Sequence, residues 1–65
     1  MIVEPFNQIE FSQRVNEELA YLGMEKQHLA KCVYVSEDRI KWGLRGKLKF
    51  KPEEVIAIKK ILGMN

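Results

Sequence analysis

The sequence predicts an all-α fold, a small domain of four or five helices. Apolar residues recur every three or four positions in four separate segments, which is the periodicity of a helix with one buried face. With 65 residues the chain has room for one domain and no second core, and the single Cys32 cannot form an internal disulfide. Because so small a core supplies little stability, we expect either well-packed helices or a second copy of the chain to support it.

The first helix is expected to begin near Asn7. Asn7 and Glu10 have the spacing of a capping box, with Ser12 as a rival start. Gly23 supplies a left-handed residue of the kind that commonly ends a helix. The expected buried stripe consists of Phe11, Val15, Leu19 and Leu22. The outer face is mainly acidic, and we assign this helix a supporting role without chemistry.

The last helix is expected to begin at Pro52 and to stop at Gly63. Proline suits the first helical position, and Glu53 and Glu54 lie near the positive end of the helix dipole. Its expected buried stripe consists of Val55, Ile58, Ile61 and Leu62. A basic segment precedes this helix, and Phe50 within it is expected to anchor the chain to the core.

Two short helices are predicted in residues 24–47, MEKQHLAKCVYVSEDRIKWGLRGK. Ser36 is a suitable N-cap for the second of them, because its hydroxyl can accept an unpaired N–H group of the first turn. So short a connection forces the helices to cross steeply, which is the geometry of a helix-turn-helix at about residues 25–46. The residues expected to pack the pair are Leu29, Ala30, Val33, Val35, Ile40 and Leu44.

The run LAKCVYVSEDRI, followed by LRGK, resembles the DNA-binding unit of the lambda-repressor-like, Cro-type regulators. The resemblance covers about residues 11–63 and implies a sequence-specific DNA-binding domain. Two positions depart from the family pattern. Tyr34 stands where a glycine usually makes the turn, so it must accept a left-handed backbone or turn another way. Gly43 stands where an apolar residue is usual, which leaves Trp42 and Leu44 to fill the space.

The charges are unevenly distributed along the chain. Residues 1–23 contain one base and four acids, whereas residues 24–51 contain eight bases and three acids. The positive charge therefore coincides with the expected DNA-binding motif. Such a basic patch is typical of a surface that binds a polyanion, although a solvated helical face is the commoner reason for a run of charges.

The second motif helix carries the expected base-reading residues: Glu37, Asp38, Lys41, Trp42 and Arg45. In the family this helix lies in the major groove of double-stranded DNA. The residues expected to contact the DNA backbone are Lys26, Gln27, Arg39, Lys47, Lys49 and Lys51. Alternatives remain for several of them. Glu37 and Asp38 also complement the start of the helix, Trp42 can cover the gap at Gly43 or lie in a subunit interface, and Gln27 can be solvated.

We therefore expect a Cro-like transcriptional repressor of phage or mobile-element origin that occupies an operator. It would be cytoplasmic, would need no cofactor or metal, and would act as a homodimer on a two-fold symmetric site. The candidate dimer contacts are the MIVEPF arm, Ile56 and Met64. No pattern typical of an enzyme is present in the sequence. The alternatives are a helix-turn-helix that binds proteins, such as an inhibitor or antirepressor, and an architectural or excision factor.

Overall fold

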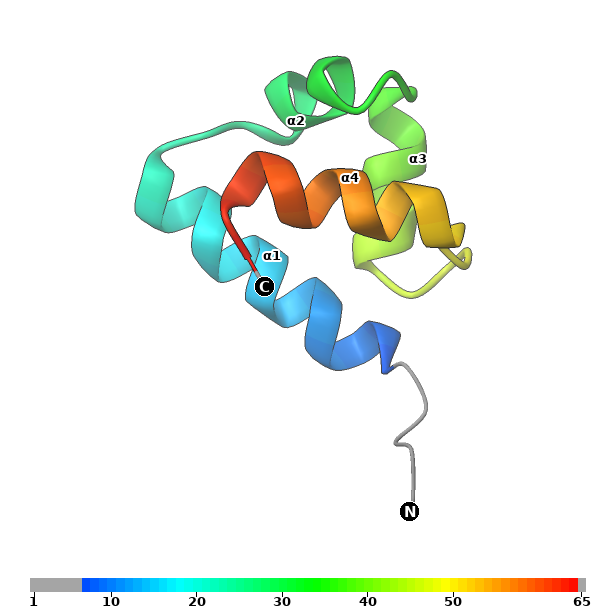
Figure 1. The fold of residues 1–65 in the computed structure, drawn as a ribbon. Helices are drawn as coiled ribbons and strands as arrows, with labels where there is room; N and C mark the ends of the chain where they lie inside the picture. The colour runs from blue at the N-terminus through cyan, green and yellow to red at the C-terminus, as the bar shows by residue number, and fades with distance from the viewer. Residues whose placement is uncertain (1–6, 65) are drawn as a thin grey trace.

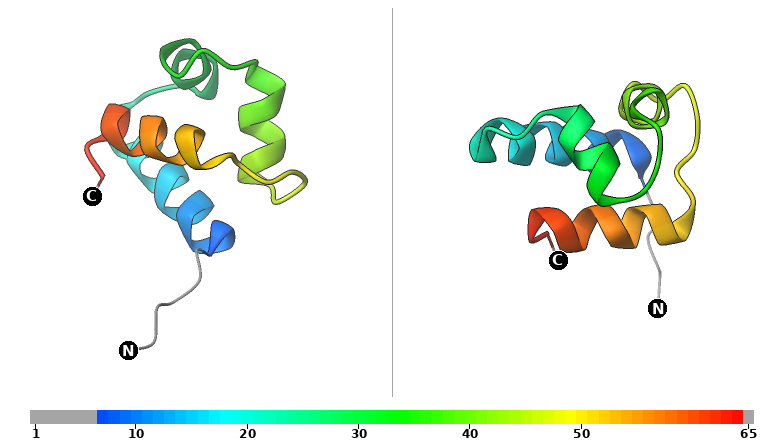
Figure 2. Two further views of the ribbon diagram at one scale, coloured as in Figure 1. Left: turned by 45° about the vertical axis from the view of Figure 1, so that its right-hand side comes forward. Right: turned by 90° about the horizontal axis from the view of Figure 1, so that it is seen from above.

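The computed structural model describes residues 7–64, which form four α-helices and no strand (Figure 1). These are α1 (Gln8–Leu22), α2 (Lys26–Cys32), α3 (Glu37–Leu44) and α4 (Pro52–Leu62). The all-α prediction is therefore confirmed. Seen from above, α4 lies on one side of the molecule and α1 on the other, with α2 between them (Figure 2). In the same view α3 is seen end-on, so it runs steeply across α2 and α4.

The core takes its most deeply buried side chains from all four helices. Val15, Leu29, Ile40 and Ile58 come from α1, α2, α3 and α4 respectively, and each is no more than 1% exposed. The apolar stripes expected from the sequence thus meet in one core, with two exceptions. Leu22 is 49% exposed and Ile61 is 39% exposed, so these residues lie at the edge of the core and not inside it.

Helix α1 begins where the sequence predicts. The Asn7 Oδ1 accepts the N–H groups of Ile9 at 3.0 Å and of Glu10 at 3.2 Å, which satisfies two donors that the helix itself leaves unpaired. Ser12, the alternative N-cap residue, instead lies within α1 and its side chain is buried. Its hydroxyl donates to the Gly43 carbonyl of α3 at 3.4 Å and so helps to join the two helices.

The connection between α2 and α3 turns through a left-handed Tyr34, with φ of 60°. The N–H of Tyr34 donates to the Lys31 carbonyl at 3.3 Å, and the N–H of Val35 donates to the Ala30 carbonyl at 3.0 Å. This pair of bonds is the Schellman arrangement, which usually has glycine at the left-handed position. Ser36 then caps α3, because its Oγ accepts the Arg39 N–H at 3.2 Å as predicted.

Gly43 allows α3 to touch the segment that follows it. A Cβ on Gly43 would overlap the ring of Phe50. This ring therefore fills the space beside Gly43 that Trp42 and Leu44 were expected to fill. Phe50 is 7% exposed and packs edge-on against Phe11, with ring centroids 5.9 Å apart. The prediction that Phe50 anchors the chain to the core is confirmed. The expectation that Trp42 and Leu44 fill the space at Gly43 is wrong, because Phe50 occupies it.

The side chain of Gln8 ties the same segment to the start of α1. Its Nε2 donates to the carbonyls of Gly43 at 2.9 Å and Leu48 at 2.6 Å, and its Oε1 accepts the Phe50 N–H at 3.1 Å. A single amide therefore binds one carbonyl near the end of α3 and two backbone groups, at Leu48 and Phe50, of the segment that follows it. The path of the chain from α3 to α4 is fixed by this amide and by the Phe50 ring.

Candidate nucleic-acid interface

Helix α3 presents a polar and aromatic face to solvent. Ile40, Gly43 and Leu44 are buried on its inner side. The opposite side carries four exposed residues, which we call the α3 outer face: Asp38, Lys41, Trp42 and Arg45. Because Ser36 and the packed inner side fix α3, Asp38, Lys41 and Trp42 are held on a packed helix, and Arg45 follows as the C-cap residue of that helix. The core of residues 7–64 does not depend on any of them.

Trp42 is 45% exposed, and the space beside Gly43 is already occupied by Phe50. The alternative in which Trp42 covers that gap is therefore wrong. The guanidinium Cζ of Arg45 lies 5.8 Å from the Trp42 ring centroid, within the range of a cation–π contact. This contact places a flat apolar surface beside a fork of hydrogen-bond donors, both turned to solvent.

Glu37 and Lys41 pair along one side of α3. Their carboxylate and ammonium groups are 3.4 Å apart at i and i+4, with side chains 41% and 47% exposed. An exposed pair of this kind contributes at most about 0.5 kcal/mol, so either group can exchange its partner for a ligand at small cost. Lys41 thus remains available to an incoming anion or base.

The start of α2 lies beside the α3 outer face. A shallow surface hollow is lined by residues from α1, α2 and α3 and from the connection before α2: Asn16, Leu19, Met24, Glu25, Lys26, Gln27, Glu37 and Lys41. The structure therefore brings Lys26 and Gln27, expected on the DNA backbone, next to Glu37 and Lys41, expected at the bases. The hollow contains both positive and negative groups, with Glu25 and Glu37 among its walls.

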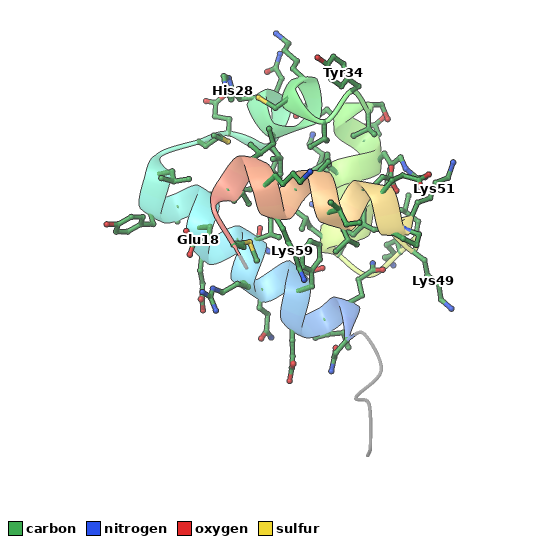
Figure 3. All side chains as sticks on the ribbon, viewed as in Figure 1. Glu18, His28, Tyr34, Lys49, Lys51 and Lys59 are labelled. Atoms are coloured by element: carbon green, nitrogen blue, oxygen red, sulfur yellow. The ribbon has the colours of Figure 1, made fainter. Side chains whose placement is uncertain are left out.

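The segment after α3 is the most basic part of the surface. Lys47, Lys49 and Lys51 are all exposed, and no ion pair holds any of them within residues 7–64. Figure 3 shows Lys49 and Lys51 pointing away from the helices at the end of the molecule opposite Glu18. Together with Arg45 they form what we call the basic loop, residues 45–51.

Arg39 differs from the other residues expected on the DNA backbone. Its guanidinium donates from Nε and Nη2 to both carboxylate oxygens of Glu54 on α4, at 2.8 Å for Nη2 to Oε1. The same Oε1 accepts the Lys51 N–H at 2.7 Å, so Glu54 also caps α4. The hydrogen bonds from Arg39 lower the pKa of Glu54, and the hydrogen bond to Glu54 raises the pKa of Arg39. The Arg39 guanidinium thus joins α3 to α4 through Glu54.

Three residues in or behind this surface were missed by sequence analysis. Gln13 and Asn16 of α1 line surface hollows that they share with Lys41 or Arg45 of the α3 outer face, although α1 was given no role beyond support. Gln8 is a structural bridge and not a surface residue. Helical spacing could have placed Gln13 and Asn16 on one side of α1, but only the packing of α1 on α3 reveals what they adjoin.

The candidate dimer contacts have different surroundings. Ile56 is 54% exposed on α4, whereas Met64 packs partly against the core. The MIVEPF arm lies outside the described residues. His28 is exposed and Cys32 is a half-buried free thiol.

Residues 7–64 contain neither a metal-binding cluster nor a helix suited to a membrane. No group of His, Cys, Asp and Glu side chains there is arranged to hold a metal ion. None of the described helices combines the length and hydropathy that a membrane crossing requires. Comparison of the chain with protein-family models, curated proteins and solved structures finds no match.

Proposed function

We propose that this chain is a sequence-specific DNA-binding regulator of transcription, with α2, the turn at Tyr34 and α3 as its helix-turn-helix. The α3 outer face is the observation that carries the proposal. A short helix, firmly packed on one side, turns a guanidinium, an ammonium, a carboxylate and an indole to solvent on the other. These are the groups that read base edges, and the major groove is wide enough to admit such a helix.

Each side chain of the α3 outer face has a plausible base partner. Arg45 and Lys41 donate to guanine, Asp38 accepts from the amino group of cytosine, and Trp42 contacts the methyl group of thymine. Asp38, with nearby Glu37, also repels phosphate. These acids therefore make misplaced docking costly and contribute to selectivity more than to affinity.

The proposed backbone contacts come from both flanks of α3. Lys26 and Gln27 lie beside it at the start of α2, and Lys47, Lys49 and Lys51 follow it in the basic loop. Phosphate contacts fix the register of a protein on the duplex without reading sequence. Arg39 is not included in this set, because its guanidinium is bound to Glu54.

The proposed mode of action is that of a Cro-like repressor: a homodimer occupies a two-fold symmetric operator and blocks access to a promoter. Two recognition helices about one DNA turn apart would read the two half-sites. Ile56, exposed on α4, is the described apolar residue best suited to a dimer contact. A cytoplasmic location and independence of any cofactor follow from this proposal.

Selection of bound duplexes from a random DNA pool at near-physiological salt tests the proposal. An enriched two-fold symmetric motif is the expected result, and its half-site spacing gives the separation of the α3 helices. Retention without enrichment would favour an architectural factor. A folded protein that retains no duplex would overturn the proposal and favour a helix-turn-helix that binds an acidic protein surface.

A further inference from the structure

The surface of α1 is divided into three stripes along its length. At about 100° per residue, the buried side carries Phe11, Ser12, Val15 and Leu19. Next to it runs an uncharged stripe, and beyond that an acidic one with Glu10, Glu17 and Glu18. We call the uncharged one the amide stripe, and its exposed members are Ile9, Gln13, Asn16 and Ala20.

The amide stripe is the side of α1 that borders α3. One surface hollow joins Asn16 to Lys41 and to the start of α2. A second joins Gln13 and Asn16 to Leu44, Arg45 and Gly46 at the other end of α3. Asn16 belongs to both hollows, so it lies alongside α3 between Lys41 and Arg45, two residues of the α3 outer face.

The amides of the stripe can offer hydrogen-bond donors to a polyanion without a charge of their own. The amides of Gln13 and Asn16 are exposed and have no hydrogen-bond partner within residues 7–64. Each amide has two N–H donors, and such side chains commonly donate to phosphate oxygens. The acids of α1 lie on the adjoining stripe, turned away from α3. The acids that do face Asn16 across the first hollow are Glu25 and Glu37.

We propose that Gln13 and Asn16 of α1 bind the phosphate backbone of the DNA strand that runs alongside α3. The inference rests on the proposed function and extends it, because α1 then becomes a third DNA-contacting element beside α2 and α3. The uncharged stripe separates the DNA from the acidic side of α1. An acidic residue at either position would set a carboxylate against the phosphates.

The test uses Asn16→Asp and Gln13→Glu, which change an amide to a carboxylate of almost the same shape. Binding to the duplex selected by the wild-type protein should fall by about tenfold or more for each variant, because like charges then face each other. Arg14→Gln is the matched control, since it also lowers the net charge by one but lies on the acidic stripe of α1, where Arg14 pairs with Glu18 at 3.7 Å. The control should change affinity by less than about twofold.

Asn16→Ala and Gln13→Ala provide a second measurement that adds no charge. Ethylation of a contacted DNA phosphate should interfere with binding of the wild-type protein. For the alanine variants, ethylation of at least one of these phosphates should no longer interfere with binding. Equal affinities for Asn16→Asp, Gln13→Glu and Arg14→Gln, or an unchanged ethylation pattern, would overturn this inference while leaving specific DNA binding intact. If the wild-type protein bound no duplex at all, the proposed function would be overturned, and this inference with it.

Discussion

Among residues 7–64, Tyr34 is the one residue without a glycine's freedom that has a left-handed backbone. Each of the four helices is followed by a left-handed residue, and three of these residues are glycines: Gly23, Gly46 and Gly63. The fourth is Tyr34, with φ of 60° and a side chain that is 94% exposed. The left-handed conformation costs an L-residue about 1 kcal/mol or more relative to glycine, and the exposed phenol recovers little of this by packing.

Tyr34→Gly is therefore expected to stabilise the protein by about 0.5–1 kcal/mol, after the greater freedom of glycine in the unfolded chain is deducted. For a domain of this size the melting temperature should rise by about 2–8 °C. Thermal unfolding followed by circular dichroism measures it. Tyr34→Ala is the control, because alanine removes the phenol and keeps the strain. A gain as large in Tyr34→Ala would show that the backbone conformation is not the cause.

Gly43 presents the reverse situation, in which the missing side chain makes room for a neighbour. Gly43→Ala should lower the free energy of unfolding by about 1 kcal/mol or more, because overpacking against the Phe50 ring costs about 1–3 kcal/mol and the gain in helix propensity is at most about 1. Urea denaturation measures the change. The double variant Gly43→Ala/Phe50→Leu should lose less than the sum of the two single losses. Additive losses would mean that the methyl group and the ring do not compete for space.

At the scale of elements, the position of α3 depends on contacts that the sequence pattern does not display. Periodicity and capping residues predicted all four helices, their starts at Asn7, Ser36 and Pro52, and the buried and exposed sides of α3. The bridge made by Gln8 joins residues 35 to 42 positions apart in the chain. Local spacing contains no information about such a pair, and the ion pair of Arg39 with Glu54 was missed for the same reason.

Glu54 links α3 to α4 only while it is ionised. Its pKa is lowered in the folded state, chiefly by the hydrogen bonds from Arg39. Its contribution to stability is therefore fully present above the pKa of an unfolded glutamate, about 4.3, and is lost as the pH falls through the lower folded-state pKa. Glu54→Gln should lower the melting temperature at pH 7 and should reduce the further loss of stability between about pH 5 and pH 2.

Melting temperatures of the wild type and Glu54→Gln across this pH range measure the effect. Glu53→Gln is the matched control, since Glu53 occupies the preceding position of α4 and is exposed. Its acid dependence should follow that of the wild type. If Glu54→Gln and Glu53→Gln gave the same pH profile, the pairing with Arg39 would contribute nothing to the acid sensitivity of the fold.

At the scale of the whole molecule, charge is separated between two regions. Acidic side chains occupy the acidic stripe of α1, and exposed lysines occupy the basic loop. Positive and negative charges are therefore separated on the surface, although the net charge is only +2. The amide stripe lies between the acids of α1 and the α3 outer face. Under the proposed function, the field of the DNA would orient the molecule before contact, with the basic loop nearest to the phosphates.

Lys47→Gln/Lys49→Gln is expected to weaken binding to every duplex by a similar factor, because the proposed function has these lysines neutralise phosphates without reading bases. The slope of log affinity against log salt should become shallower by about 2, one unit for each lost phosphate contact. Fluorescence anisotropy with a selected and a random duplex at several salt concentrations measures both quantities. Lys59→Gln/Lys60→Gln is the control of equal charge on α4, which contributes no residue to the proposed DNA interface, and Figure 3 shows Lys59 well away from Lys49. Equal changes in slope for the two double variants would mean that net charge alone acts. A loss confined to the selected duplex would instead place Lys47 or Lys49 at the bases, and the basic loop would then share in sequence recognition with α3.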